Sequence, residues 1–90
     1  MTQAIVNPEE LRRFANLLRE MNADLQDKLR VLIGQFEALG ETWRDQEHEK
    51  FREQFLQYVH MAQQFVEANE EHIPFLLRKA ERIEEYLNQR

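Results

Sequence analysis

The chain has 90 residues, of which 42% are hydrophobic and 32% charged, with two glycines, two prolines and no cysteine. This length allows one small domain, and this composition is typical of long amphipathic helices rather than of a β-sandwich, a barrel or a disordered tail. The net charge of −5 argues against nucleic acid as a partner, and the lack of cysteine excludes disulfides, thiolate metal sites and cysteine nucleophiles.

The first predicted helix covers about residues 8–39. Asn7 is a suitable N-cap, and Pro8 suits the first helical position. Leucines then recur every seven residues: Leu11, Leu18, Leu25, Leu32 and Leu39. A second apolar row joins them, made of Phe14, Met21, Leu29 and Phe36. This broad stripe favours a globular bundle over a long two-stranded coiled coil. Gly40, directly after the last leucine, is a suitable C-cap.

A turn is predicted over residues 40–45, Gly40-Glu41-Thr42-Trp43-Arg44-Asp45. Two long helices joined by so few residues fold back as an antiparallel pair. Either Thr42 or Asp45 can cap the helix that follows. Trp43 then lies at the tip of the hairpin. There it either plugs the end of the core, with its indole N–H bonded to a carbonyl, or forms part of a recognition patch.

The second predicted helix covers about residues 45–72 and is followed by a helical segment over about 74–88. Pro74 separates the two, because proline lacks a backbone donor and clashes with the preceding turn, so a kink or a break is expected there. The helical phase nevertheless continues across the proline, with Phe55, Ala62, Asn69, Leu76 and Ile83 spaced by seven. With the turn centred near Thr42, Pro74 is expected opposite Leu11.

A hairpin of two helices buries too few side chains for each residue that it orders, so a partner is expected. Two such hairpins can pair into a four-helix-bundle dimer. Residues 54–66 support this, because they carry no formal charge when His60 is neutral, although glutamine is also an ordinary surface residue. Six residues are expected to form the core and the dimer seam: Leu18, Leu25, Leu32, Phe55, Tyr58 and Phe65.

Candidate chemistry is sparse. The histidines, His48, His60 and His72, are twelve residues apart, whereas two metal ligands on one helix need a spacing of three or four. Asp45 and His48 have the spacing of half a metal site, but they read as a cap and a solvated ring. The carboxylates lie beside Lys and Arg, as on ordinary helix surfaces. No catalytic residue, metal ligand or cofactor is expected, and the protein is not expected to be an enzyme.

No apolar run is long enough to span a bilayer, so stable membrane insertion is not expected. A protein bound to the membrane surface would need a strongly basic polar face, which the acidic balance disfavours. The N-terminus, residues 1–6, has neither a basic region nor a full apolar region of an ordinary secretory signal. The chain is therefore expected to be cytosolic, or exported by a route that does not read such a signal.

The pattern resembles the WXG family, small helix–turn–helix proteins with Trp-x-Gly in the turn, which are the early-secreted-antigen-like substrates and partners of type VII secretion. The resemblance covers nearly the whole chain and rests on Leu39-Gly40-Glu41-Thr42-Trp43-Arg44-Asp45, with Phe51 and Phe55 following at helical spacing. It implies hairpins that pair into a four-helix bundle, as a homodimer or with a related hairpin protein. It also implies a cytoplasmic location before export without a signal peptide, and a secretion ATPase as a further candidate partner.

Two positions depart from the family pattern. The glycine of Trp-x-Gly is Asp45, which can cap the second helix or tolerate a left-handed turn. The family's export signal, a tyrosine followed four residues later by an acid, is missing, since Tyr86 is followed by Arg90 and Tyr58 by Ala62. If the chain is exported, a paired partner could supply that signal.

The resulting interpretation is a dimeric binding module, a type VII secretion substrate or a secretion partner or chaperone, with Gly40, Trp43 and Asp45 as its turn motif. The alternative is a cytosolic helical adaptor or scaffold that has the same architecture and no role in secretion.

Overall fold

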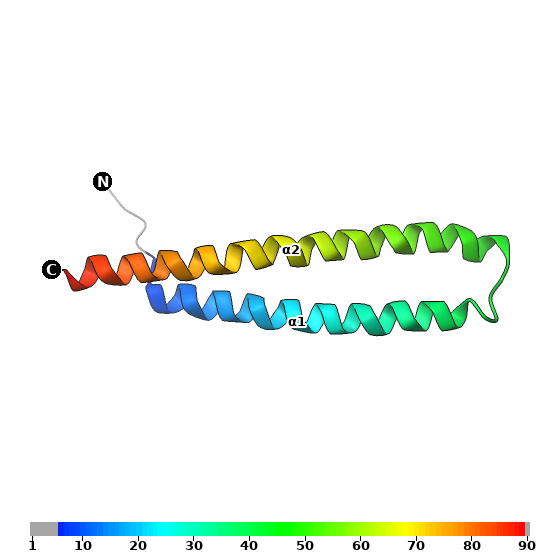
Figure 1. The fold of residues 1–90 in the computed structure, drawn as a ribbon, viewed down its shortest axis with the longest axis horizontal. Coiled ribbons are helices and arrows are strands. Elements are labelled where there is room, and N and C mark those ends of the chain that lie inside the picture. Colours follow the sequence, from blue (N-terminus) through cyan, green and yellow to red (C-terminus); the bar gives the residue numbers. More distant parts are fainter. Residues whose placement is uncertain (1–5, 90) are drawn as a thin grey trace.

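The computed structural model describes residues 6–89 of the chain. It consists of α1 (Pro8–Leu39) and α2 (Gln46–Asn88), which lie side by side in opposite directions (Figure 1). The rod measures 68 × 25 × 15 Å. The expected helical hairpin is therefore confirmed over the described residues. Residues 1–5 and 90, which the expected single domain over 1–90 includes, lie outside them.

The start and end of α1 follow from local chemistry. Asn7 is extended, with φ −70° and ψ 122°, and its side-chain oxygen accepts from the Glu9 N–H at 2.8 Å. Pro8 follows at the first helical position, where no backbone donor is needed. Gly40 is the C-cap, and its N–H bonds to the carbonyls of Phe36 and Glu37. These contacts satisfy backbone groups that a helix end would otherwise leave unpaired.

Helix α2 is continuous through Pro74, so of the kink or break expected there the break between 72 and 74 does not occur, and residues 74–88 belong to the same helix. Pro74 itself is exposed, whereas Ile73 and Ala80 are buried against α1. Buried contacts with α1 therefore flank the proline on both sides. The lost donor leaves the Glu70 carbonyl without its usual partner on an exposed part of the helix.

The pairing of the two helices also differs from expectation near Pro74. This residue lines a hollow with Arg19, Asn22 and Ala23 rather than lying opposite Leu11. The turn explains this difference. Helix α2 begins only after Asp45, so the centre of the turn lies further along the chain than Thr42. Each residue of α2 therefore lies opposite a later residue of α1 than expected. The last turns of α2 consequently run beside the start of α1.

The hairpin has a thin interior. The buried apolar residues of the described part are Ala15, Phe55, Val66, Ile73 and Ala80, and no large side chain among them is fully buried. The accessible surface is 7557 Å², against roughly 5,600 Å² for a compact monomer of 11.0 kDa. Much apolar surface is therefore left uncovered. Neither helix within residues 6–89 is both long enough and apolar enough to cross a membrane.

Candidate functional site

The turn is built from short backbone contacts at the end of α1. The Trp43 N–H bonds to the Leu39 carbonyl at 2.9 Å, and the Thr42 hydroxyl donates to the same carbonyl at 3.3 Å. Asp45, not Thr42, caps α2, because its carboxylate accepts from the His48 N–H at 3.0 Å. Asp45 has φ −98° and ψ −176°, an extended conformation that any residue adopts. An aspartate at the family's glycine position therefore fits the turn without strain.

An aromatic cluster fills the space behind the turn. The Trp43 ring meets the His48 ring edge-on at 5.0 Å and lies 6.1 Å from the Phe51 ring. His48 stacks on Phe36 at 5.2 Å, and Phe36 contacts Phe55 at 4.6 Å. Trp43 is only half-buried and has no indole hydrogen bond within residues 6–89. It therefore closes the end of the hairpin by ring contacts and keeps one side exposed.

His48 is buried, so its interpretation as a solvated ring is wrong. The residue is 9% exposed, and its Nε2 is the one buried side-chain nitrogen or oxygen of the described residues without a hydrogen-bond partner. A Cβ at Gly40 would lie in ordinary contact with this Nε2, at 3.5 Å, and in tighter contact with the Glu37 carbonyl oxygen, at 3.3 Å. The sequence carried a signal for this burial, because His48 stands seven residues before Phe55 in the buried row of α2.

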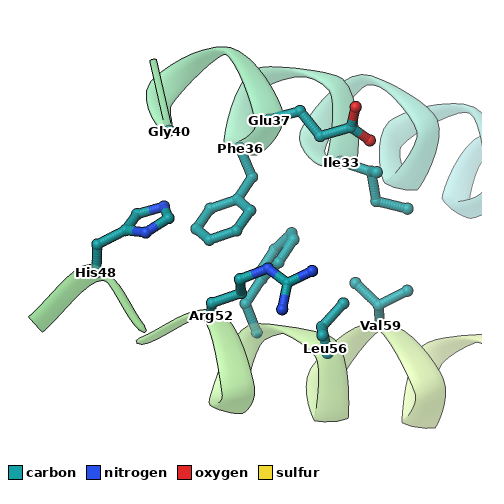
Figure 2. Close-up of a pocket in the computed structure, with 9 residues that line it drawn as sticks. Ile33, Phe36, Glu37, Gly40, His48, Arg52, Leu56 and Val59 are labelled. Carbon is teal, nitrogen blue, oxygen red and sulfur yellow. The ribbon is translucent and has the colours of Figure 1, made fainter. Parts of the chain in front are cut away.

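A groove of about 330 Å³ opens between the helices beside this cluster (Figure 2). Its lining is mostly apolar and includes Ile33, Phe36, Phe55, Leu56 and Val59, with Glu37, Gly40, His48 and Arg52. Within residues 6–89, no three His, Asp or Glu side chains come together in a way that could hold a metal ion. The groove is therefore lined mostly by apolar side chains and has no such cluster among the described residues.

The six residues expected in the core and seam have different surroundings in the hairpin. Phe55 is buried at 6% exposure, and Leu18 and Leu25 are half-buried. Leu32, Tyr58 and Phe65 are 52%, 54% and 48% exposed. The hairpin therefore uses the first group for its own interior and leaves the second group uncovered.

The uncovered group belongs to one stripe, which we call the seam stripe: Phe14, Met21, Leu32, Tyr58, Met61 and Phe65. At about 100° per residue, its α1 members lie roughly 80–100° from the buried Asn22, and its α2 members lie roughly 20–80° from the buried Asn69. Both offsets have the same rotational sense. Because the helices are antiparallel, the same sense places both sets on the same face of the hairpin.

A pair of buried amides lies between the helices. The Asn69 Nδ2 donates to the Asn22 Oδ1 at 2.8 Å, and the Asn22 Nδ2 donates to the Val66 carbonyl at 3.0 Å. The two residues are 5% and 8% exposed. Asn69 was expected in an apolar row, whereas no role was predicted for Asn22. The signal for Asn22 was its place in the row of Ala15, Leu29 and Phe36.

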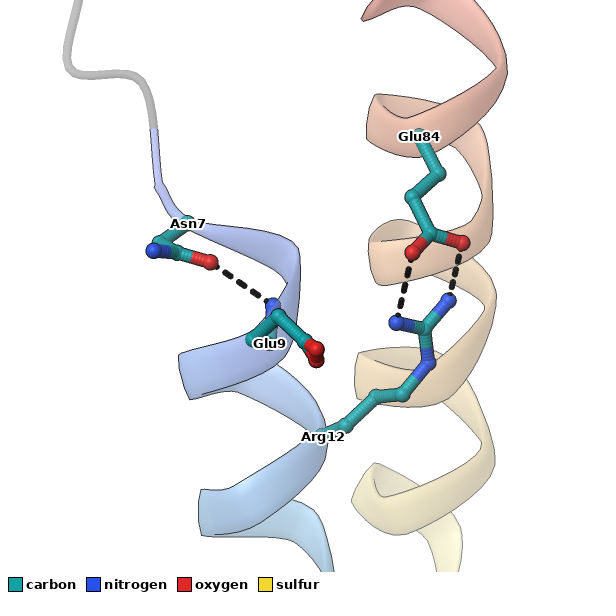
Figure 3. A network of polar contacts seen from close by, with 4 residues as sticks. All are labelled: Asn7, Glu9, Arg12 and Glu84. Atoms are coloured by element: carbon teal, nitrogen blue, oxygen red, sulfur yellow. Dashed lines mark hydrogen bonds and ion pairs between the residues drawn. The ribbon is translucent and has the colours of Figure 1, made fainter. Parts of the chain in front are cut away.

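An ion pair closes the open end of the hairpin (Figure 3). The two terminal guanidinium nitrogens of Arg12 donate to the two carboxylate oxygens of Glu84, and the bond from Nη1 measures 2.8 Å. These hydrogen bonds lower the pKa of Glu84 and raise that of Arg12. The contact joins the start of α1 to the last turns of α2.

These features define a class of protein, the antiparallel helical hairpins with an aromatic turn and one uncovered apolar stripe. The family model WXG100, "Proteins of 100 residues with WXG", matches residues 3–86, and the chain belongs to this family. No curated protein matches the sequence. Among solved structures, the chain is similar to the secreted protein EsxB of Bacillus anthracis.

A single-residue mutant of EsxB is 28% identical to the chain, with a TM-score of 0.77, and the match covers 96% of both chains. The wild-type EsxB structure is 27% identical, with a TM-score of 0.76, and the match covers 93% of this chain and 97% of EsxB. A selenomethionine form of EsxB gives 27% identity and a TM-score of 0.76 over 96% and 98% of the two chains.

Proposed function

We propose that the protein is a non-catalytic, dimeric binding module of type VII secretion, exported as a substrate or acting as the partner of one. In this proposal a second hairpin covers the seam stripe and completes a four-helix bundle. The observation that carries it is the uncovered seam stripe on a hairpin of the WXG100 family.

The surface of the hairpin supports the dimer. The chain exposes about 1,900 Å² more than a compact monomer of its mass. Obligate dimers cover roughly 2,000–5,000 Å² in total, so the excess on two chains is sufficient for such an interface. The seam stripe is also rich in Phe, Tyr and Met, which are the residues that protein interfaces favour. A second copy is the simplest occupant, since it presents the same stripe.

Likeness to EsxB supports export, because that protein is described as secreted and matches nearly the full length of this chain. In the sequence, Tyr86 is followed four residues later by Arg90 rather than by an acid. We therefore propose that the chain is not exported through a tyrosine–acid motif at Tyr86.

Export is tested in the bacterium that carries the gene, with a small tag at the N-terminus. The tagged protein is measured in cell pellets and culture supernatants, with and without the membrane-anchored secretion ATPase. We expect the protein in the supernatant of the parent strain and its loss from the supernatant of the ATPase mutant. A cytosolic enzyme measured in the same samples controls for lysis. Retention of the protein in the cells of both strains would contradict export.

A cytosolic adaptor is the second candidate, and the missing acid after Tyr86 is the observation that favours it. The same experiment separates the two functions. An adaptor stays in the cells of both strains and still forms the dimer, whereas a secretion protein needs the ATPase to leave the cell.

A further inference from the structure

The amide pair of Asn22 and Asn69 is unusual for its position, because it interrupts two otherwise apolar rows. On α1 the row is Ala15, Asn22, Leu29 and Phe36, and on α2 it is Phe55, Ala62, Asn69, Leu76 and Ile83. Each row repeats every seven residues, and the two asparagines meet where the rows face each other. Leucine at both positions would complete the rows. The presence of two polar side chains at these positions therefore indicates a role other than hydrophobic burial.

We propose that Asn22 and Asn69 are specificity-determining residues of association, which fix the face that α1 and α2 turn toward each other and so leave the seam stripe for the partner. This role rests on the dimer of the proposed function. The pair selects one packing of the helices over another and does not add stability. Buried polar residues have this role in some helical assemblies.

The apolar pattern of α2 explains why specificity-determining residues are needed. Besides the row that contains Asn69, the helix carries a row of Phe51, Tyr58 and Phe65, also spaced by seven. The second row lies about 40° further around the helix, because four residues turn the chain by roughly 400°. Both rows are apolar and aromatic. Hydrophobic burial alone would therefore allow α2 to turn either row toward α1.

The short turn limits sliding of the helices, but it does not fix their rotation. Rotation of α2 toward the Tyr58 and Phe65 row would carry Asn69 away from Asn22. The two side-chain amides would then lose each other as partners, and the buried Asn22 amide would be left unpaired, which is costly. The observed packing satisfies them, since Asn22 accepts from Asn69 and donates to the Val66 carbonyl. The hydrogen bonds thus mark one face of each helix as the hairpin interior.

The test replaces both amides in the full-length chain, N22L/N69L, and counts the packings that result. Trp43 is the only tryptophan, so its indole N–H gives one proton–nitrogen NMR peak for each environment of the turn. Sedimentation velocity on the same samples reports the association states. We expect one indole peak and one dimeric species for the wild type. For N22L/N69L we expect additional indole peaks or mixed association states, with a melting temperature at or above that of the wild type.

A single indole peak and a single dimeric species in N22L/N69L would overturn the proposal. The matched control is N16L, because Asn16 is exposed on α1 and receives the same substitution outside the helix interface. We expect wild-type behaviour from it. If the wild type itself sediments as a monomer, the proposed dimer fails, whereas the indole peaks still report whether the pair selects one packing of the hairpin.

A rescue variant separates the loss of the amides from the presence of leucine. Leu29 and Ala62 lie one seven-residue repeat nearer to the turn than Asn22 and Asn69, so they face each other in the same register. Adding L29N/A62N to N22L/N69L therefore moves the pair along the same rows. We expect the single indole peak and the single dimer to return. Continued heterogeneity would mean that leucine packing caused the mixture, and it would overturn the proposal.

Discussion

Phe65 provides the sharpest test of the seam stripe. Its side chain is 48% exposed in the hairpin, which leaves about 100 Å² of a ring residue of about 200 Å² for a partner to cover. Covering this area in the dimer contributes about 25 cal/mol per Å². Phe65→Ala removes most of that area, so it weakens the dimer by about 2 kcal/mol per chain. A symmetric dimer loses the contact twice, about 4 kcal/mol, so its Kd should rise roughly a thousandfold.

The assay is sedimentation equilibrium of wild type and Phe65→Ala over a range of concentrations, with helicity checked by circular dichroism. Leu56→Ala is the matched control, because Leu56 is 49% exposed and lies about half a turn around α2 from Phe65. We expect Leu56→Ala to dimerise like the wild type. Equal weakening by both variants, or no weakening by Phe65→Ala, would refute the assignment of the seam stripe.

Three further outcomes follow from single contacts. Asp45→Ala should lower stability by about 1 kcal/mol through loss of the cap, and Asp45→Gly by only a few tenths, as melting curves at one protein concentration would show. Pro74→Ala should raise stability by as much as about 3 kcal/mol, measured by urea unfolding, because it restores the donor to the Glu70 carbonyl. Hydrogen bonds from Arg12 lower the pKa of Glu84, so the ionised carboxylate stabilises the folded state above its ordinary pKa and less as the pH falls through the lowered value. Glu84→Gln should therefore melt lower than the wild type at neutral pH, and the difference should vanish in strong acid.

Each of these three predictions has a contradicting result or a control variant. Equal losses for the alanine and glycine variants of Asp45 would show that the side chain does not act as a cap. A Pro74→Ala variant less stable than the wild type would mean that the proline itself contributes more to the stability of α2 than the restored hydrogen bond does. Glu85→Gln, at an exposed neighbouring position without an ion pair in the described residues, should melt like the wild type across the pH range.

The hairpin could be predicted because its signals are local. Asn7 and Pro8 start α1, Gly40 ends it, and each acts through contacts within four residues. The same holds for Asp45 at the start of α2. At Pro74 the sequence left a kink and a break open. The break does not occur, and local signals could not decide this, because Ile73 and Ala80 are buried against α1 on both sides of the proline.

The polar residues of the interior were harder to predict. His48 and Asn22 stand in apolar rows, but whether such a residue is buried depends on what lies across the interface. Phe36 lies against His48, and Asn69 lies against Asn22. The apolar pattern also could not separate Phe55 from the seam stripe, because both rows of α2 look alike until α1 covers one of them.

The central claim is that the seam stripe requires a second molecule. It is tested most directly by the molar mass of the purified chain in dilute solution, measured by light scattering after size exclusion. The expected mass is twice the 11.0 kDa of one chain, for a cooperatively melting helical species. A well-folded species of 11.0 kDa with the same helicity and a cooperative melt would contradict the claim.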